Sequence, residues 1–296
     1  MKRIFLIVVI LAMLLAACGS TAEEPVSEPA TAVPEQVAEE VAEVVEATAV
    51  PTEEPTPTKE PTPEPTEEPT PEPKPTYAPE DIMSEDIIVE AEDGLELNAT
   101  FYAAEGLENG PGIILLHMLG SNRTVWEYVG LVDELAANGY AVLALDMRGH
   151  GDTGNAQDWV LAEDDIQRVW EHFVERPEVD VEKTAVLGGS IGSSMALVAT
   201  ANEPAIKTAV LLSPGLIYRG VAIESRMPDI GERPLFLVAS EDDYYSEDTA
   251  LKLAETAVGE TQVQIYENAG HGTRMFEPQP DLTPLILEWL DENLAK

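Results

Sequence analysis

After its first 84 residues, the chain alternates short apolar runs with patterns of helical period. Residues 112–117 form a continuous apolar run, which is typical of a strand buried on both faces of a parallel sheet. Residues 166–174 place apolar side chains at the i, i+3, i+4, i+7 and i+8 positions of a helix that faces a core. Two strands, 86–90 and 95–102, flank an Asp93-Gly94 turn and are expected to form an antiparallel hairpin.

This alternation predicts a single α/β domain with a mostly parallel sheet, helices on both faces and an N-terminal antiparallel hairpin. Active sites of such sheets lie at the carboxyl ends of the strands, so the residues that directly follow a strand are the candidates for chemistry. Further strands are expected at 140–145, 184–187, 208–212, 234–239 and 262–266, and helices at about 125–137, 191–201, 246–258 and 282–294.

Residues 1–17 have the organisation of a secretory signal peptide. Lys2 and Arg3 supply positive charge, and the apolar segment 4–17 is shorter than the roughly 20 residues that span a bilayer as a helix. The only cysteine of the chain follows Leu15-Ala16-Ala17, an arrangement that resembles the lipobox of bacterial lipoproteins. The resemblance implies that Cys18 is acylated at the new N-terminus and anchors the protein to a membrane outside the cytoplasm, at the cell surface or in the periplasm. The alternative is an unmodified cysteine inside an ordinary signal peptide.

Residues 18–80 are predicted to be an unfolded tether. Fourteen of the 23 prolines lie between residues 19 and 80, and residues 56–75 repeat Pro-Thr-Pro-Glu-like units with almost no apolar side chains. Such a segment cannot bury enough apolar surface to fold, and proline favours an extended chain. The folded domain is therefore expected to be residues 81–296, which are enough for one core.

The expected domain is strongly acidic, with 40 acidic and 12 basic residues. Such a surface repels a phosphate backbone, so no nucleic-acid partner is expected; the charge either keeps the protein soluble or favours cationic partners. With a single cysteine in the chain, no intrachain disulfide and no thiolate metal site can form. No metal-binding constellation or nucleotide-binding loop is evident, and no cofactor is expected.

Three strand ends carry the residue types of nucleophilic catalysis. The sequence Gly188-Gly189-Ser190-Ile191-Gly192 matches G-x-S-x-G between an apolar strand and a helix, a context in which a tight turn lifts the serine hydroxyl clear of the backbone. The strand 234–239 is followed by Ser240-Glu241-Asp242-Asp243, and the last strand by Asn268-Ala269-Gly270-His271-Gly272. The chain order serine, aspartate, histidine is that of the α/β-hydrolase fold.

Two further motifs strengthen this resemblance. His117-Met118-Leu119-Gly120 stands where these proteins have an oxyanion loop, and residues 146–151 resemble their D-x-R-G-x-G turn. The domain is thus similar to α/β-hydrolases of the dienelactone hydrolase or serine-aminopeptidase-like type, and the resemblance implies a serine hydrolase. The chain departs from the family pattern at Met118 and Ser240, where glycine is usual or frequent, and its domain lacks the cysteine nucleophile of dienelactone hydrolases.

The resemblance implies a role for each residue of the three strand ends. Ser190 is expected to be the nucleophile and His271 its general base. Asp243 is expected to orient the imidazole, because the aspartate of the family is the fourth residue of its turn, and Asp242 is the alternative.

The remaining polar residues of these motifs are expected to act through the backbone or to be structural. The backbone amides of Leu119 and Ile191 are expected to bind the tetrahedral oxyanion. His117 and His150 lie in motifs where the family uses them structurally, and His172 lies within a helix as a surface or packing residue. Arg123 and Arg148 could contact an anionic substrate, but salt bridges to the many acidic residues are favoured for both.

The segment 214–233, between two of the expected strands, bears on the substrate class. It is too short for a sizeable cap, so the cleft is expected to be open, which suits short or exposed carboxylic esters that react through an acyl-enzyme. A peptidase that acts on short peptides with the same residues is one alternative, and a non-catalytic cell-surface binding protein is the other. Five side chains either line this cleft or pack elsewhere: Tyr218, Tyr244, Tyr245, Met227 and Met275.

The lipobox resemblance makes a direct prediction. Replacing Cys18 by serine removes the acylated thiol, and the protein should then move from the membrane fraction to the soluble fraction after cell lysis. Immunoblotting of both fractions measures this shift. A variant that stays with the membranes would contradict lipid anchoring at Cys18.

Overall fold

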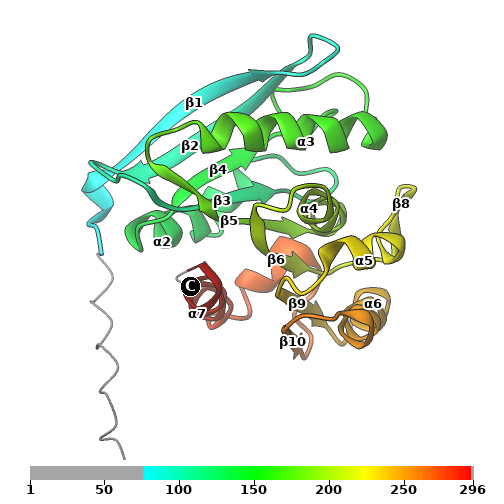
Figure 1. Ribbon diagram of the computed structural model, residues 1–296. Coiled ribbons are helices and arrows are strands. Elements are labelled where there is room, and N and C mark those ends of the chain that lie inside the picture. The colour runs from blue at the N-terminus through cyan, green and yellow to red at the C-terminus, as the bar shows by residue number, and fades with distance from the viewer. Residues whose placement is uncertain (1–75, 295–296) are drawn as a thin grey trace, which may run out of the picture. The chain divides into compact units, whose positions relative to one another are not determined.

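In the computed structural model, residues 76–294 are described, and they form an eight-stranded sheet with helices on both faces (Figure 1). The strand order is β1-β2-β4-β3-β5-β6-β9-β10. β1 (Ile82–Glu90) pairs antiparallel with β2 (Glu96–Ala104), and β2 pairs antiparallel with β4 (Ala141–Leu145). All other neighbours in this sheet are parallel: β3 (Gly110–Leu116), β5 (Val179–Gly189), β6 (Ile206–Leu212), β9 (Leu235–Ser240) and β10 (Thr261–Tyr266). The predicted hairpin and mostly parallel sheet are confirmed.

The helices lie in two layers, one on each face of the sheet. α1 (Val125–Tyr128), α2 (Leu131–Ala137) and α7 (Leu282–Leu294) pack on one face. The other face carries four helices: α3 (Trp159–Val174), α4 (Ile191–Asn202), α5 (Met227–Ile230) and α6 (Tyr244–Thr256). Figure 1 separates α2 and α7 from α3 and α4 across the sheet.

The central strand β3 explains why its sequence is apolar throughout. Ile114 and Leu116 belong to the core beneath α3 and α4, whereas Ile113 and Leu115 belong to the core beneath α2 and α7. Successive side chains of a strand point to opposite faces, and here both faces are covered. The four side chains have no exposed surface.

The prediction of one continuous helix over residues 125–137 is wrong. The segment 125–137 is broken into α1 and α2, because Gly130 takes a left-handed conformation with φ of 75°. The helical period continues across the break, which is why the sequence pattern did not reveal it. The other predicted helices are present, with α3 beginning at Trp159, α6 at Tyr244, and the bounds of α7 as expected.

The segment between β6 and β9 contains only short elements. These are a two-stranded hairpin, β7 (Ile217–Tyr218) and β8 (Val221–Ala222), the 3₁₀ helix η2 (Glu224–Arg226) and the single-turn α5. The expectation of little or no cap domain is confirmed.

A buried ion-pair cluster fixes the turn that follows β4. Arg148, only 3 % exposed, donates to both carboxylate oxygens of Asp165 at 2.7 and 2.6 Å and to Asp93 at 2.6 Å. Asp165 lies in α3 and Asp93 in the β1–β2 turn, so one guanidinium joins three parts of the fold. Arg123 likewise pairs with Asp146 and Asp152. Both arginines therefore pair with acids, as the sequence favoured.

The predicted signal peptide, Cys18 and the tether up to residue 75 lie outside the described residues. Near the start of the described residues, the Tyr77 amide donates to the Ala137 carbonyl at 2.8 Å, and the first element is the 3₁₀ helix η1 (Pro79–Asp81). Within residues 76–294, no helix is long and apolar enough to cross a membrane.

The ion-pair cluster predicts that removing a buried carboxylate lowers the free energy of unfolding more than removing an exposed one. Asp165→Ala removes the buried partner of Arg148 and should destabilise the fold by about 3 kcal/mol. Glu182→Ala breaks the exposed pair with Lys207 and should cost less than about 1 kcal/mol. Urea unfolding of both variants measures the difference. Equal losses of stability would show that the cluster does not hold the fold as described.

Candidate active site

Ser190 lies in a strained turn between β5 and α4. Its φ is 55° and its ψ is −122°, which is outside the regions that L-residues ordinarily occupy. The turn needs glycine on both sides: a Cβ on Gly188 would lie 2.0 Å from the carbonyl oxygen of Gly192, and a Cβ on Gly192 would lie 2.2 Å from that of Leu116. The G-x-S-x-G pattern thus forms the sharp strand–turn–helix that the sequence predicted.

His271 lies in the loop after β10, next to the Ser190 turn. Its Nδ1 lies 2.6 Å from Oδ2 of Asp243. Asp243 ends the short loop after β9 and is the N-cap residue of α6. The imidazole is 35 % exposed and the carboxylate 19 %, so the pair is open to solvent on one side. With Nδ1 donating to the carboxylate, Nε2 is the nitrogen left to accept a proton.

Asp242, the alternative acid, has different partners. Its Oδ1 accepts hydrogen bonds from the Ser240 hydroxyl and, at 3.2 Å, from the Gly270 amide. The Ser240 hydroxyl also accepts from the Ala269 amide at 2.8 Å. Ser240 and Asp242 thus fasten the loop that carries His271. Of the two aspartates, Asp243 is the one in contact with the imidazole.

Ser190 and His271 are neighbours without a direct hydrogen bond between their side chains among the described residues. The two loops touch through backbone: a Cβ on Gly272 would lie 3.8 Å from the Ser190 nitrogen. Two hydrogen bonds fix their spacing, from the Ser190 amide to the Leu212 carbonyl and from the Gly272 amide to the Ser213 hydroxyl, both at 2.8 Å.

Tyr218 is the site residue whose place the sequence did not single out. It comes from the short β7–β8 hairpin, and its ring centroid lies 6.3 Å from that of His271. Burial raises the pKa of its phenol to about 12, while hydrogen bonds to Ser246 and Ser190 act in the opposite direction. The phenol therefore stays protonated at neutral pH, beside the candidate nucleophile.

The other four side chains that the sequence offered for the cleft lie elsewhere or at its edge. Met227 and Met275 are buried in the two cores. Tyr244 is 76 % exposed. The hydroxyl of Tyr245 accepts a hydrogen bond from the Ile217 amide at 2.9 Å, so this residue supports the hairpin that carries Tyr218.

The two residues expected to offer backbone amides to the oxyanion, Leu119 and Ile191, follow the paired strands β3 and β5. Ile191 begins α4, and the first amides of a helix have no partner within it. Leu119 lies in the loop after β3, and His117 holds the backbone before it. His117 Nδ1 lies 2.9 Å from the Met118 carbonyl, and the Met147 amide lies 3.1 Å from Nε2.

Burial makes His117 a structural group. Desolvation lowers its pKa to about 4, so the ring is neutral at physiological pH, when it can donate from Nδ1 and accept at Nε2. The ring of His150 packs edge-on against it, with 4.9 Å between centroids. The structural interpretation of both histidines is confirmed. His172, in α3, is only half-buried, as expected for a residue at a helix surface.

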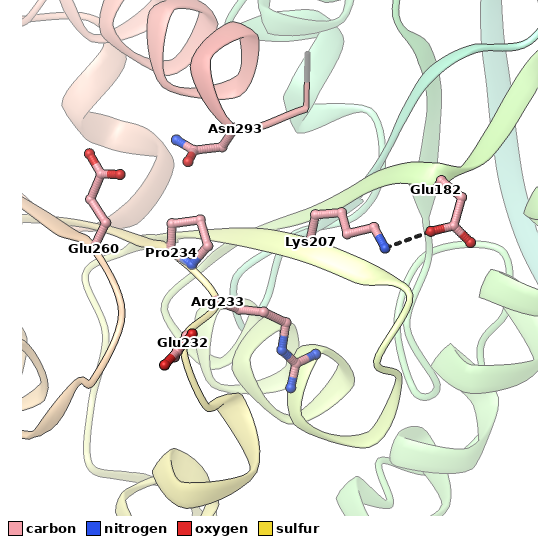
Figure 2. A pocket seen from close by; sticks show the side chains of 7 residues that line it. All are labelled: Glu182, Lys207, Glu232, Arg233, Pro234, Glu260 and Asn293. Carbon is pink, nitrogen blue, oxygen red and sulfur yellow. Dashed lines mark hydrogen bonds and ion pairs between the residues drawn. The ribbon is translucent and has the colours of Figure 1, made fainter. Parts of the chain in front are cut away.

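A depression of about 460 Å³ lies at the edge of the sheet where the parallel strands begin (Figure 2). Its residues stand at the amino ends of β6, β9 and β10, away from the strand ends that carry Ser190 and His271. Lys207 pairs with Glu182 at 2.8 Å, the contact drawn as a dashed line. The Arg233 guanidinium donates to the carbonyls of Glu203 and Ile230. Both cations of this depression are thus already paired within the protein.

No group of three or more histidine, cysteine, aspartate or glutamate side chains in residues 76–294 is arranged to hold a metal ion.

Comparisons with known proteins agree with this fold. Residues 111–223 match the family model described as serine aminopeptidase, S33; this range includes Ser190 and ends before Asp243 and His271. A comparison with curated protein sequences finds no significant match.

Many solved structures resemble the chain at low identity. An esterase of Pyrococcus furiosus is 18 % identical, with a TM-score of 0.62 over 74 % of this chain and 94 % of its own. An acetyl xylan esterase from a Paenibacillus species is 19 % identical, with a TM-score of 0.60 over 74 % and 86 % of the two chains. A dienelactone hydrolase from Anabaena variabilis is 19 % identical, with a TM-score of 0.60 over 72 % and 99 %. The chain therefore has the α/β-hydrolase fold, and the family match supports a hydrolase.

The two neighbouring aspartates offer a matched test of the site. Asp243→Asn leaves His271 without its carboxylate and should lower kcat for an ester by about 10²–10⁴-fold. Asp242→Asn keeps an oxygen that can accept from Ser240 and Gly270, so it should lower kcat by less than about tenfold. Steady-state hydrolysis of p-nitrophenyl butyrate compares the two. A greater loss in Asp242→Asn would reverse the assignment.

Proposed function

We propose that this protein is a serine hydrolase, and that its most favourable substrates are carboxylic esters. The observation that supports the proposal best is the 2.6 Å contact between His271 Nδ1 and Asp243, next to a serine in a strained glycine-flanked turn. A carboxylate that fixes one imidazole nitrogen leaves the other free to act as a base.

In this proposal, Ser190 forms an acyl-enzyme. Its Oγ attacks the ester carbonyl carbon, and the proton passes to Nε2 of His271. The same proton then passes to the leaving alcohol as the carbon–oxygen bond breaks. Water attacks the acyl-enzyme by the reverse sequence, which releases the carboxylic acid and restores the serine.

The tetrahedral intermediate needs donors for its negative oxygen. The backbone amides of Leu119 and Ile191 are proposed for this role, since a backbone donor does not depend on the identity of the side chain. Met118 stands at a position where the family that the chain resembles usually has glycine, and its side chain does not remove either backbone amide. β7 and β8 have two residues each, so the segment between β6 and β9 is too short for a sizeable cap, which favours esters whose scissile bond is accessible.

The matched family description favours one alternative. A serine aminopeptidase would use the same three residues on a peptide bond. A non-catalytic binding protein on the same scaffold is the remaining alternative, and the retained His271–Asp243 pair argues against it.

Localisation is part of the proposal. Cleavage before Cys18 and its acylation would hold the domain on the outer side of a cytoplasmic membrane or on the cell surface, with residues 18–80 as spacer. No nucleic-acid partner is proposed, because the domain is strongly acidic.

A fluorophosphonate probe tests the mechanism independently of the natural substrate. We expect one adduct, on Ser190, located by peptide mass spectrometry, and no adduct in Ser190→Ala. His271→Ala should label at least about 100-fold more slowly, because the serine loses its base. Ser84→Ala, at an exposed position of β1, is the serine control, and it should label at the wild-type rate.

The outcomes separate the alternatives. Labelling of Ser190 together with turnover of aminoacyl anilides but not of esters would favour the peptidase. A folded protein that takes no label and hydrolyses neither substrate would favour the binding protein.

A further inference from the structure

A groove runs along the helical face that carries α1, α2 and α7. It consists of two neighbouring hollows, of about 530 and 370 Å³, which are both lined by Val129 and Phe276. The first hollow lies between α1 and the 3₁₀ helix η3 (Gly272–Phe276), and the second continues between the start of α2 and the start of α7.

The near end of the groove adjoins the candidate active site. Met118 and Thr273 line this end, and the Thr273 hydroxyl lies 3.6 Å from the Met118 sulfur. Met118 directly precedes Leu119 of the oxyanion loop, and Thr273 is two residues beyond His271. A Cβ on Gly272 would lie 3.1 Å from the Met118 sulfur and 3.8 Å from the Ser190 nitrogen. A group bound to Ser190 thus reaches the groove past the Met118 side chain.

The walls of the first hollow are mostly apolar, whereas those of the second are more polar, and the charged side chains of both stand at exposed positions. Val129 and Leu287 are half-buried, Tyr128 is 89 % exposed, and Pro280 and Pro284 are exposed. Glu134, Arg274 and Glu277 supply the polar groups. In so acidic a domain, a mostly apolar hollow that ends at Met118 and Thr273, close to the Ser190 turn, is a surface suited to an apolar ligand.

We propose that this groove binds the acyl chain of the substrate, so that the enzyme prefers esters of medium-chain fatty acids, about six to ten carbons, to acetates. The proposal rests on the proposed serine hydrolase function. The acyl group is the part that stays bonded to Ser190 after the alcohol has left, so a groove beside the nucleophile can hold it through both steps. Met118, between nucleophile and groove, is the residue that limits how wide a chain can enter.

A series of p-nitrophenyl esters with acyl chains of two, four, six and eight carbons tests the proposal, below their aggregation concentrations. Full burial of a methylene is worth about fourfold in binding, and a groove open on one side should give about half of that free energy, or about twofold. We therefore expect kcat/KM to rise by at least about tenfold from acetate to octanoate. The full-length Cys18→Ser chain is used, so that no protein-linked acyl chain competes.

Two variants address the groove itself. Val129→Asp places a charge where the two hollows meet and should lower the octanoate-to-acetate ratio of kcat/KM by at least about fivefold. Tyr128→Ala, at a position where misfolding is not expected, should lower this ratio by about two- to threefold. Val258→Asp introduces the same charge at a 74 % exposed residue after α6 and should leave both rates unchanged.

Each outcome decides the matter. A rising series whose ratio falls in Val129→Asp and Tyr128→Ala, but not in Val258→Asp, supports the groove as the acyl site. A flat series, or equal ratios in all variants, would overturn it. Fluorophosphonate labelling of Ser190 keeps the two proposals apart: labelled protein with a flat series refutes the groove alone, whereas unlabelled protein without turnover refutes the hydrolase function.

Discussion

The site depends on one close contact, where the first turn of α4 passes beneath the end of β3. Gly192 lies against the carbonyls of Leu116 and His117, and no side chain would fit between them. This contact holds the strained Ser190 turn against the loop that begins at His117. The same strand end therefore positions both the candidate nucleophile and the loop that carries one proposed oxyanion donor. The conformational strain at Ser190 is sustained because β5 and α4 are buried on both sides of it.

Much of this arrangement was predictable from the sequence because its signals are local. The Asp93-Gly94 turn, the apolar run at β3 and the G-x-S-x-G pentapeptide each specify a backbone shape within a few residues. Chain order then brought Asp243 and His271 to neighbouring strand ends. The break at Gly130 was missed because apolar side chains continue at helical spacing on both sides of it.

What the sequence could not supply depends on contacts between distant segments. Tyr218 lies beside His271 because the short β7–β8 hairpin carries it there, and Gly215 leaves room for its ring, since a Cβ there would lie 2.4 Å from the ring. The choice between Asp242 and Asp243 required the orientation of two adjacent carboxylates. The groove was hidden for the same reason, since its walls come from α1, α2, η3 and α7.

The hydrogen bond between Tyr77 and Ala137 bears on how the domain is presented to its surroundings. Ala137 ends α2, just before the amino end of β4, so the chain enters the domain at the sheet edge opposite Ser190 and His271. The point at which the chain enters the domain is therefore far from the loops that carry Ser190 and His271, so the entering segment at Tyr77 does not occlude them.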